Sequence, residues 1–474
     1  MLNRKAIVLL LALVMAKPCF GRVFLRWTVP AVPPAPSLGV KDLVIPWRDG
    51  QGPLFRTAKR QGYQVYAEVS PEHAKSAVAV LAKMDIAGII VRVEAASTED
   101  LAATGSHDKL IQDLRTVYPR LLVRLVRPGG KQADMQGTMV VESNGVLQVS
   151  SPTQQPWIDS NVALTRFLRA YHPNEVPLIG FEWNLQDSIE QRYGPPPQDY
   201  LIAVAEAGAF HYDVILPIHD SLQNGLVRGN PQAQRVWSEI RKYIQFYARG
   251  DGNEQAHLVS DVGVVTEDYD SSFEAMNLMA RHNIPFRVIR PDELDAGLLQ
   301  GMAVIVFFSP LDGSAAEFVN RFATLGGTVV LVGQTGNFPW HSAPQVKENS
   351  EVRVYTTGKG RVLEFSAPIV DPDSFARDMW RLLEKPGHTV SLWNALTILA
   401  ANQAEGASGA QIDLVNYSAQ PTRVQVRVKG TFSHIRYDTP EHGCCISLAP
   451  KVQNGFTQFV VPQVLIGGAV HLSP

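Results

Sequence analysis

Short apolar runs alternate with amphipathic stretches from residue 42 to about residue 250. The apolar runs are expected to be strands at residues 43–47, 63–69, 88–93, 121–126, 138–142, 177–183 and 212–217. The stretches between them carry hydrophobic residues at helical spacing, at residues 53–61, 71–84, 108–118, 159–171, 197–210 and 230–247. Strand and helix in alternation predict a parallel sheet in an α/β fold, and the number of repeats favours a (β/α) TIM-like barrel with one element degenerate or missing. A doubly wound open sheet is the alternative, although no glycine-rich loop follows the first strand.

A second α/β unit follows the first. Strands are expected at residues 261–265, 286–289, 303–308, 327–332 and 361–365, and helices at residues 270–283 and 313–325. Ser271 and Glu274 match a capping box at the start of the first of these helices. This order of elements predicts a flavodoxin-like unit.

The periodicity changes again near residue 389, where short runs alternate with period two, as in residues 410–417, 422–428 and 456–461. Such runs with frequent turns are typical of a small antiparallel β-sandwich. The expected domains are residues 42–255 for the barrel, 256–386 for the second α/β unit and 387–474 for the sandwich. Residues 22–41 hold four prolines and are expected to be a linker or a wrapped arm.

Residues 1–21 resemble a secretory signal peptide. Arg4 and Lys5 precede an apolar core at residues 6–15 that is too short to span a bilayer. We therefore expect a secreted protein, periplasmic or extracellular, with no stable membrane span after cleavage; an uncleaved anchor is the alternative. The 43 basic and 45 acidic residues nearly balance, which gives no indication of a nucleic-acid partner and suits a neutral substrate.

The chain has three cysteines, and two of them, Cys444 and Cys445, are neighbours. A disulfide between neighbours is strained and rare, so we expect no disulfide framework. No cysteine and histidine spacing is typical of zinc, so neither a metal nor a cofactor is expected.

Carboxylates follow several of the predicted barrel strands, at Glu68, Glu94, Glu142, Glu182 and Asp220. In a β/α barrel this position places a side chain at the catalytic mouth. Phe181 and Trp183 flank Glu182, an apolar setting that suits a general acid, so we assign it the general acid/base role. Asp220 follows the next strand and is the preferred partner, with Glu68 and Glu94 in reserve. Pairing of each carboxylate with an arginine is the alternative.

Candidate sugar contacts cluster in two loops and beside Asp220. Trp183 and Trp157 can stack on a sugar ring, Asn184, Asp159 and Asn161 can bind hydroxyls, and His219 can donate a hydrogen bond. The alternative for residues 157–161 is an ordinary helix start, with Asp159 or Ser160 as the cap.

The three-part layout resembles the family 42 glycoside hydrolases, the bacterial β-galactosidases. Residues 261–265, 303–310 and 326–334 look like that family's amidotransferase-like trimerisation domain, and residues 412–418 look like its last domain. The resemblance implies a homotrimer. The family's acid/base is a Glu preceded by Asn after the fourth barrel strand; here Asn174-Glu175 lies in a helix-to-strand loop, so no catalytic residue is transferred. The middle unit lacks cysteine and is expected to be a scaffold rather than a glutaminase.

Together these features predict a secreted glycoside hydrolase that acts on a neutral oligo- or polysaccharide by paired-carboxylate chemistry. The alternative is a catalytically inactive carbohydrate-binding or assembly protein of the cell envelope. A periplasmic solute-binding protein of two lobes is a third possibility, against which the C-terminal β-domain counts.

Overall fold

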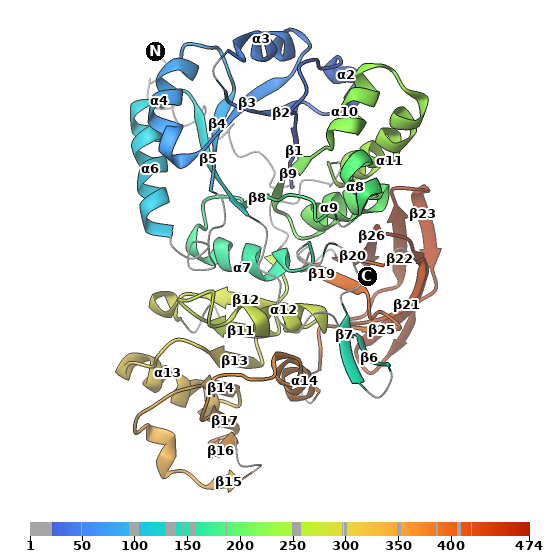
Figure 1. Ribbon diagram of the computed structural model, residues 1–474. Coiled ribbons are helices and arrows are strands. Elements are labelled where there is room, and N and C mark those ends of the chain that lie inside the picture. The colour runs from blue at the N-terminus through green and yellow to red at the C-terminus, as the bar shows by residue number, and fades with distance from the viewer. Residues whose placement is uncertain are drawn as a thin grey trace, which may run out of the picture.

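The computed structural model describes residues 21–48, 50–93, 104–128, 139–143, 146–150, 155, 158–185, 187–248, 257–295, 297, 301–347, 352–384, 387–404, 409–418 and 420–474. It has a barrel, a central α/β unit and a C-terminal β-sandwich (Figure 1). The expected signal peptide lies almost wholly outside the described residues. Among the described residues, no helix combines the length and the apolar character needed to span a bilayer.

Seven parallel strands close the barrel in the order β1-β2-β3-β4-β5-β8-β9. They are β1 (Val23–Arg26), β2 (Asp42–Pro46), β3 (Gln64–Val69), β4 (Gly88–Arg92), β5 (Leu122–Pro128), β8 (Leu178–Gly180) and β9 (Asp213–Pro217). The TIM-like fold predicted from the alternation is therefore confirmed, with seven strands.

Two expectations about the barrel strands are wrong. Residues 22–41 are not a linker throughout, because β1 pairs with β2 and β9 and closes the barrel. Its residues Val23, Phe24 and Leu25 are buried, and the prolines begin only after it. The run at residues 138–142 is not a barrel strand: its described residues, 139–142, fall in β6 (Met139–Ser143), which pairs with β7 (Val146–Ser150) in a separate antiparallel hairpin. A short apolar run looks the same in either setting.

Helices surround the barrel. They are α2 (Ala35–Leu38), α3 (Gly52–Arg60), α4 (Pro71–Leu81), α6 (Thr104–Val117), α7 (Asn161–Tyr171), α8 (Ser188–Tyr193), α9 (Pro197–Ala209), α10 (Asp220–Val227) and α11 (Pro231–Ala248). Apart from α8, which has no buried residue, these helices place apolar residues against the outward-facing strand residues, since alternate residues of a strand point to opposite sides.

One residue from each strand fills the barrel interior. These residues form a closed cluster of Phe24, Val44, Tyr66, Ile90, Val126, Leu178 and Ile215. The positions two residues later point inward as well and form the next layer toward the carboxyl ends of the strands. That layer includes Arg26, Glu68, Arg92 and Gly180.

The central unit is a seven-stranded sheet of order β12-β11-β13-β14-β17-β16-β15. Its strands are β11 (Val262–Val265), β12 (Phe286–Ile289), β13 (Val304–Phe307), β14 (Thr328–Val332), β15 (Gln345–Lys347), β16 (Val352–Thr357) and β17 (Gly360–Phe365). The first five strands in spatial order are parallel; β16 runs antiparallel to β17, and β15 runs antiparallel to β16. The helices are α12 (Phe273–Arg281), α13 (Gly313–Thr324) and α14 (Pro372–Leu382), with short 3₁₀ turns at Pro291–Glu293 and Pro339–Ser342.

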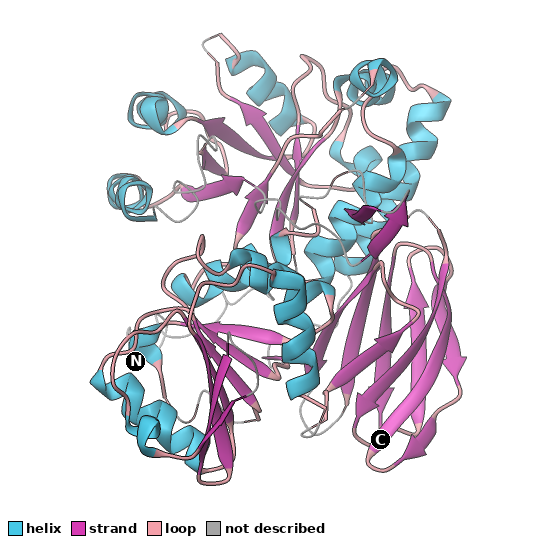
Figure 2. Cartoon of the chain, turned by 60° about the horizontal axis from the view of Figure 1, so that its bottom comes forward, coloured by secondary structure: helices cyan, strands magenta, loops and turns pink. Residues whose placement is uncertain are grey.

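Two antiparallel sheets face each other in the C-terminal unit (Figure 2). The six-stranded sheet holds β10 (His257–Leu258), β19 (Ile398–Ala404), β20 (Ala410–Asn416), β26 (Gly467–Ser473), β22 (His434–Thr439) and β23 (Gly443–Leu448). The four-stranded sheet holds β18 (Val390–Trp393), β21 (Thr422–Lys429), β25 (Phe456–Val464) and β24 (Lys451–Gln453). Residues from both sheets share one core, as the predicted sandwich requires.

Candidate active site in the barrel mouth

The chain delivers Glu182 and Asp220 to the same end of the barrel from neighbouring strands. Strands β8 and β9 pair in parallel, with Leu178 opposite Asp213 and Gly180 opposite Ile215. Glu182 lies just after β8 and Asp220 just after β9, and both are exposed. The predicted adjacency of these two strands is confirmed. Glu182 and Asp220 therefore both lie at the carboxyl-end mouth.

The inward-facing residues of β8 lead to Glu182 at the carboxyl end of the barrel. Leu178 points into the barrel, and Gly180 also points inward, because a Cβ there would meet Val126 and Arg92. Phe181 is buried in the outer core between strands and helices. Glu182 comes next, two residues beyond the end of β8, and it is exposed at this end of the barrel.

Asp220 lies over the junction of β9 and β1. Its carboxylate accepts a hydrogen bond from the Thr28 hydroxyl, just after β1. His219 precedes it as the N-cap of α10, and its Nδ1 lies 2.9 Å from Ser221 Oγ. The His219 ring is therefore engaged with the start of α10, and its expected role as a donor to sugar stays a prediction.

Glu68 has two arginine partners inside the barrel. It is 6% exposed, and both carboxylate oxygens lie 3.0 Å from Arg26 Nε. Arg92 Nε lies 3.1 Å from Glu68 Oε2 on the other side. Pairing with arginine, the alternative to a catalytic role, therefore applies to Glu68, because protein donors occupy its carboxylate oxygens. Arg26 and Arg92 form the charged floor of the mouth.

Trp183 fixes the loop after β8 against β9. Its indole Nε1 donates to the Pro217 carbonyl at 2.5 Å, and its ring meets Phe181 and Tyr200 edge-on. The backbone of Asn184 is held by Gln155, which accepts from the Asn184 N–H at 2.9 Å and donates to its carbonyl at 3.0 Å. The Asn184 side chain stays exposed. These contacts position the loop that carries Glu182.

Asp159 and Asn161 do not reach the mouth, which corrects the expectation that they bind sugar hydroxyls. Both are 1% exposed, and Asp159 forms an ion pair with Arg281 of α12. Burial raises the pKa of Asp159 to about 7, although Arg281 opposes the shift. Burial, followed by repulsion from Asp159, also raises the pKa of nearby Glu206 well above its usual value. The ion pair of Asp159 with Arg281 therefore connects the barrel to the central unit. Trp157 and Glu94, also expected at the site, lie outside the described residues.

Sequence reasoning missed Asp199, in the first turn of α9. The side chain is 4% exposed, and its Oδ2 is buried without a hydrogen-bond partner. Burial, followed by repulsion from Glu190, raises its pKa to about 6, while a hydrogen bond from Gln155 opposes the rise. Acidic residues are common in the first turn of a helix, so the sequence around Asp199 gives no indication that this carboxyl is buried.

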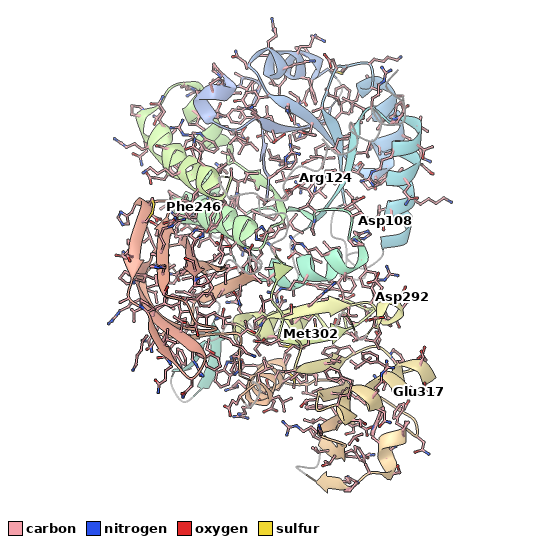
Figure 3. The ribbon with its side chains drawn as sticks, turned by 180° about the vertical axis from the view of Figure 1, so that it is seen from behind. Asp108, Arg124, Phe246, Asp292, Met302 and Glu317 are labelled. Carbon is pink, nitrogen blue, oxygen red and sulfur yellow. A yellow bond between two sulfur atoms is a disulfide. The ribbon has the colours of Figure 1, made fainter. Side chains whose placement is uncertain are left out.

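A small pocket lies at the opposite end of the barrel. Its charged lining includes Asp108, Arg124, His172 and Glu175, around the starts of β5 and β8 (Figure 3). Arg124 pairs with Asp213, and Glu175 pairs with Arg115 at 2.5 Å, so these charges are engaged by the protein. Barrel enzymes place their active sites at the carboxyl ends of the strands, so this pocket is not the candidate site.

Comparison with known proteins shows the fold. No family model and no curated protein sequence matches the chain. An α-L-fucosidase isoenzyme from Paenibacillus thiaminolyticus is similar, with a TM-score of 0.58 and 12% identity over 96% of this chain and 100% of that chain. A β-galactosidase from Rahnella sp. R3 has a TM-score of 0.59 and 10% identity over 95% of this chain and 99% of that chain.

A GH42 β-galactosidase from G. stearothermophilus is also similar, with a TM-score of 0.50 and 9% identity over 97% of this chain and 99% of that chain. At these identities the likeness concerns the fold, and it extends over barrel, central unit and sandwich. The chain is thus a distant structural relative of these glycoside hydrolases.

Proposed function

We propose that the protein is a glycoside hydrolase that uses Glu182 and Asp220 at the barrel mouth. The observation that carries the proposal is that two exposed carboxylates follow two adjacent parallel strands at one end of a closed barrel. Cleavage of a glycosidic bond needs two carboxyl groups, about 5 Å apart in retaining enzymes and about 6.5–9.5 Å apart in inverting ones. Adjacent strands lie about 4.8 Å apart, so carboxylates in the loops that follow them can approach this range.

The two carboxylates have different surroundings, which suggests different roles. Glu182 lies in the loop after β8, which contacts of Trp183 and Gln155 anchor, and it is exposed at the mouth, where a general acid/base can reach a substrate. Asp220 accepts a hydrogen bond from the Thr28 hydroxyl, which holds its carboxylate over the junction of β9 and β1. In this proposal Glu182 is the general acid/base, and Asp220 is the nucleophile or the base that activates water.

The substrate in this proposal is a neutral oligo- or polysaccharide, as for the similar proteins named as galactosidases and a fucosidase. The test is turnover of a panel of nitrophenyl glycosides and oligosaccharides. Glu182→Gln and Asp220→Asn should each lower kcat by roughly 10²–10⁴-fold, the usual contribution of a positioned acid or base. Glu239→Gln, on the exposed face of α11, is the matched control and should leave turnover unchanged.

A second candidate is an inactive carbohydrate-binding protein of the cell envelope. It is favoured by Glu68, the carboxylate inside the barrel, whose oxygens are occupied by Arg26 and Arg92. Binding without turnover would support this second candidate. In that case titration calorimetry would show that an oligosaccharide binds the wild-type protein, while no substrate of the panel is cleaved.

Export and assembly complete the proposal. Secretion to the periplasm or beyond rests on the N-terminal sequence, and N-terminal sequencing of the mature protein tests it, with cleavage near Gly21 as the expected result.

A homotrimer rests on the resemblance of the central unit to a trimerisation domain. Light scattering that gives three times the mass of the mature chain would support it, and a monomer would overturn it.

A further inference from the structure

Three neighbouring strands of the C-terminal sandwich bring two cysteines, a carboxylate and an imidazole onto one face. β22 pairs with β23 on one side and with β26 on the other. Along β22, Ile435 and Tyr437 are buried in the sandwich core, so Arg436 and Asp438 point to the outer face. His471 of β26 lies directly opposite Arg436 and shares that face.

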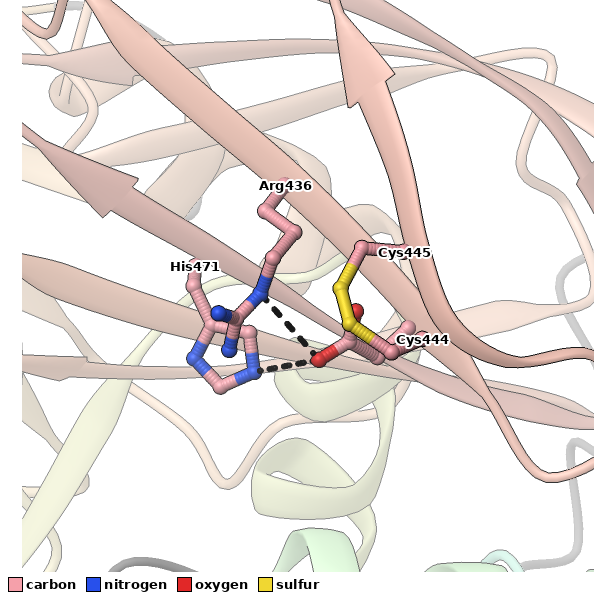
Figure 4. The surroundings of a disulfide bond; sticks show 5 residues. Arg436, Cys444, Cys445 and His471 are labelled. Atoms are coloured by element: carbon pink, nitrogen blue, oxygen red, sulfur yellow. Dashed lines mark ion pairs between the residues drawn. A yellow bond between two sulfur atoms is a disulfide. The ribbon is translucent and has the colours of Figure 1, made fainter.

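An irregularity in the ladder places both cysteines against Asp438. Tyr437 pairs with Ile446 and Thr439 pairs with Gly443, so two residues of β23, Cys444 and Cys445, stand opposite one residue of β22. This is the arrangement of a β-bulge, which redirects side chains that a regular strand would send to opposite faces. Cys444 and Cys445 are joined by a disulfide, contrary to the expectation from sequence, and Figure 4 shows the bond near Arg436 and His471. The ligand atoms of Asp438 and of both cysteines lie within 4.8 Å of one another.

These groups lie close enough together to surround a single ion once the disulfide is reduced. One ligand atom from each of Asp438, Cys444 and Cys445 lies within 4.8 Å of the others. His471 Nε2 lies 3.5 Å from Asp438 Oδ2. Zinc bonds of about 2.0–2.3 Å in tetrahedral geometry separate ligand atoms by about 3.3–3.8 Å, a separation that the two sulfurs can reach only after the disulfide between them is reduced.

The carboxylate is only partly satisfied by the protein. Asp438 Oδ2 meets His471 and, at 3.3 Å, Arg436 Nε, whereas Asp438 Oδ1 is buried without a hydrogen-bond partner. A buried carboxylate oxygen without a partner is costly, and a cation would satisfy it. The Arg436 side chain is half exposed, so it can turn toward water when a cation takes its place.

We propose that Asp438, Cys444, Cys445 and His471 form a redox-gated site for a thiophilic divalent cation of the zinc class. In the disulfide form the sulfurs are not thiolates, and the site is closed. A dithiol reductant transfers two electrons and two protons to the disulfide, which becomes two thiols while the reductant becomes a disulfide. The cation then displaces the two thiol protons and forms two metal–sulfur bonds, with the carboxylate and the imidazole as the other ligands.

Cadmium is the probe, because sulfur-to-cadmium charge transfer absorbs in the ultraviolet and reports bound thiolate directly. The experiment uses the chain with Cys19→Ser, in which Cys444 and Cys445 are the only cysteines. The protein reduced with a dithiol, then freed of reductant without air, should bind one cadmium ion per chain with a charge-transfer band. The oxidised protein and the Cys444→Ser/Cys445→Ser variant should show no band.

The other two ligands are tested in the same background. Asp438→Asn and His471→Gln should each weaken cadmium binding roughly tenfold or more, since even outer partners of metal ligands contribute that much. His434→Gln is the matched control, because His434 is an exposed histidine on β22, the strand that carries Asp438. This variant should bind cadmium as tightly as its parent. Circular dichroism checks that each variant is folded. A reduced protein without a band overturns the proposal, as does equal affinity in the Asp438→Asn and His471→Gln variants.

Discussion

The buried carboxyl of Asp199 makes the stability of the barrel depend on pH. Its pKa is raised to about 6 by burial and by Glu190, whereas an aspartate in the unfolded chain titrates near its ordinary value of about 3.9. Between these two values the folded state holds a proton that the unfolded state has released. This contribution is therefore fully present at low pH, is lost as pH rises toward about 6, and does not change further above that.

Asp199→Asn should remove this dependence, because an amide stays neutral. At pH 7 we expect the variant to be more stable by about 1–3 kcal/mol, an upper range set by the two-unit shift, and at pH 4 to match the parent. Urea unfolding at both values measures this. Asp292→Asn is the control, since Asp292 is exposed, and its carboxylate pairs with Arg290. A variant less stable at pH 7 would show that the ionised carboxylate has a partner that stabilises it.

The charged floor of the mouth gives a second prediction for a single residue. Glu68 neutralises Arg26 and Arg92 inside the barrel, where the arginine side chains are 23% and 14% exposed. Glu68→Gln leaves two like charges facing each other with little water, so we expect a loss of about 3–5 kcal/mol in the free energy of unfolding. Glu239→Gln breaks an exposed pair with Lys242 and should change stability by less than about 1 kcal/mol in the same urea titration.

At the scale of elements, one buried ion pair connects the start of α7 to the end of α12. The Asp159 and Arg281 side chains are 0% and 6% exposed. Arg281→Met leaves the carboxylate without its partner, and the expected loss is about 3–5 kcal/mol. The double variant Asp159→Asn/Arg281→Met should lose less than the single variant, because no unpaired charge remains. Thermal unfolding of both variants measures the difference, and equal losses would contradict a role for the charge.

The hydrophobic periodicity and the turn residues predict most helices and strands of this chain, and the predictions that are wrong have local causes. The barrel strand β1 was missed because its four residues stand just before a proline-rich stretch. The run at residues 138–142 was assigned to the barrel because a hairpin strand and a barrel strand have the same short apolar pattern. The antiparallel strands β15 and β16 were not predicted at all.

The candidate site was predictable only where it depends on strand order. The positions of Glu182 and Asp220 follow from two strands that are consecutive around the barrel. The partner of Asp159 lies on α12, more than a hundred residues along the chain, and no local pattern could reveal it. The group around Asp438 likewise joins three strands, and a bulge aligns it, so no linear cysteine spacing could indicate it.

At the scale of the whole molecule, the three units share buried surface. One core cluster includes outward-facing barrel residues, Met276 and Phe375 of the central unit, and Leu399, Val415 and Tyr417 of the sandwich. Domains joined by a continuous apolar core unfold together when the interface contributes as much as each domain does. We therefore expect a single transition in calorimetry, with equal calorimetric and van't Hoff enthalpies.

Gly467 is where this docking can be disturbed most selectively. It lies on β26, and a Cβ at this position would overlap the Tyr247 hydroxyl of α11 and lie 3.1 Å from Ala205 Cβ of α9. Gly467→Ala should therefore force the sandwich away from the barrel helices at a cost of about 1–3 kcal/mol, while the sandwich core itself is unchanged. The expected result is a lower transition temperature and a calorimetric enthalpy that exceeds the van't Hoff value, because the units begin to unfold separately. Gly313→Ala is the control, since a Cβ there meets nothing within 4 Å at the start of α13. A single unshifted transition in Gly467→Ala would mean that the barrel and the sandwich do not depend on this contact.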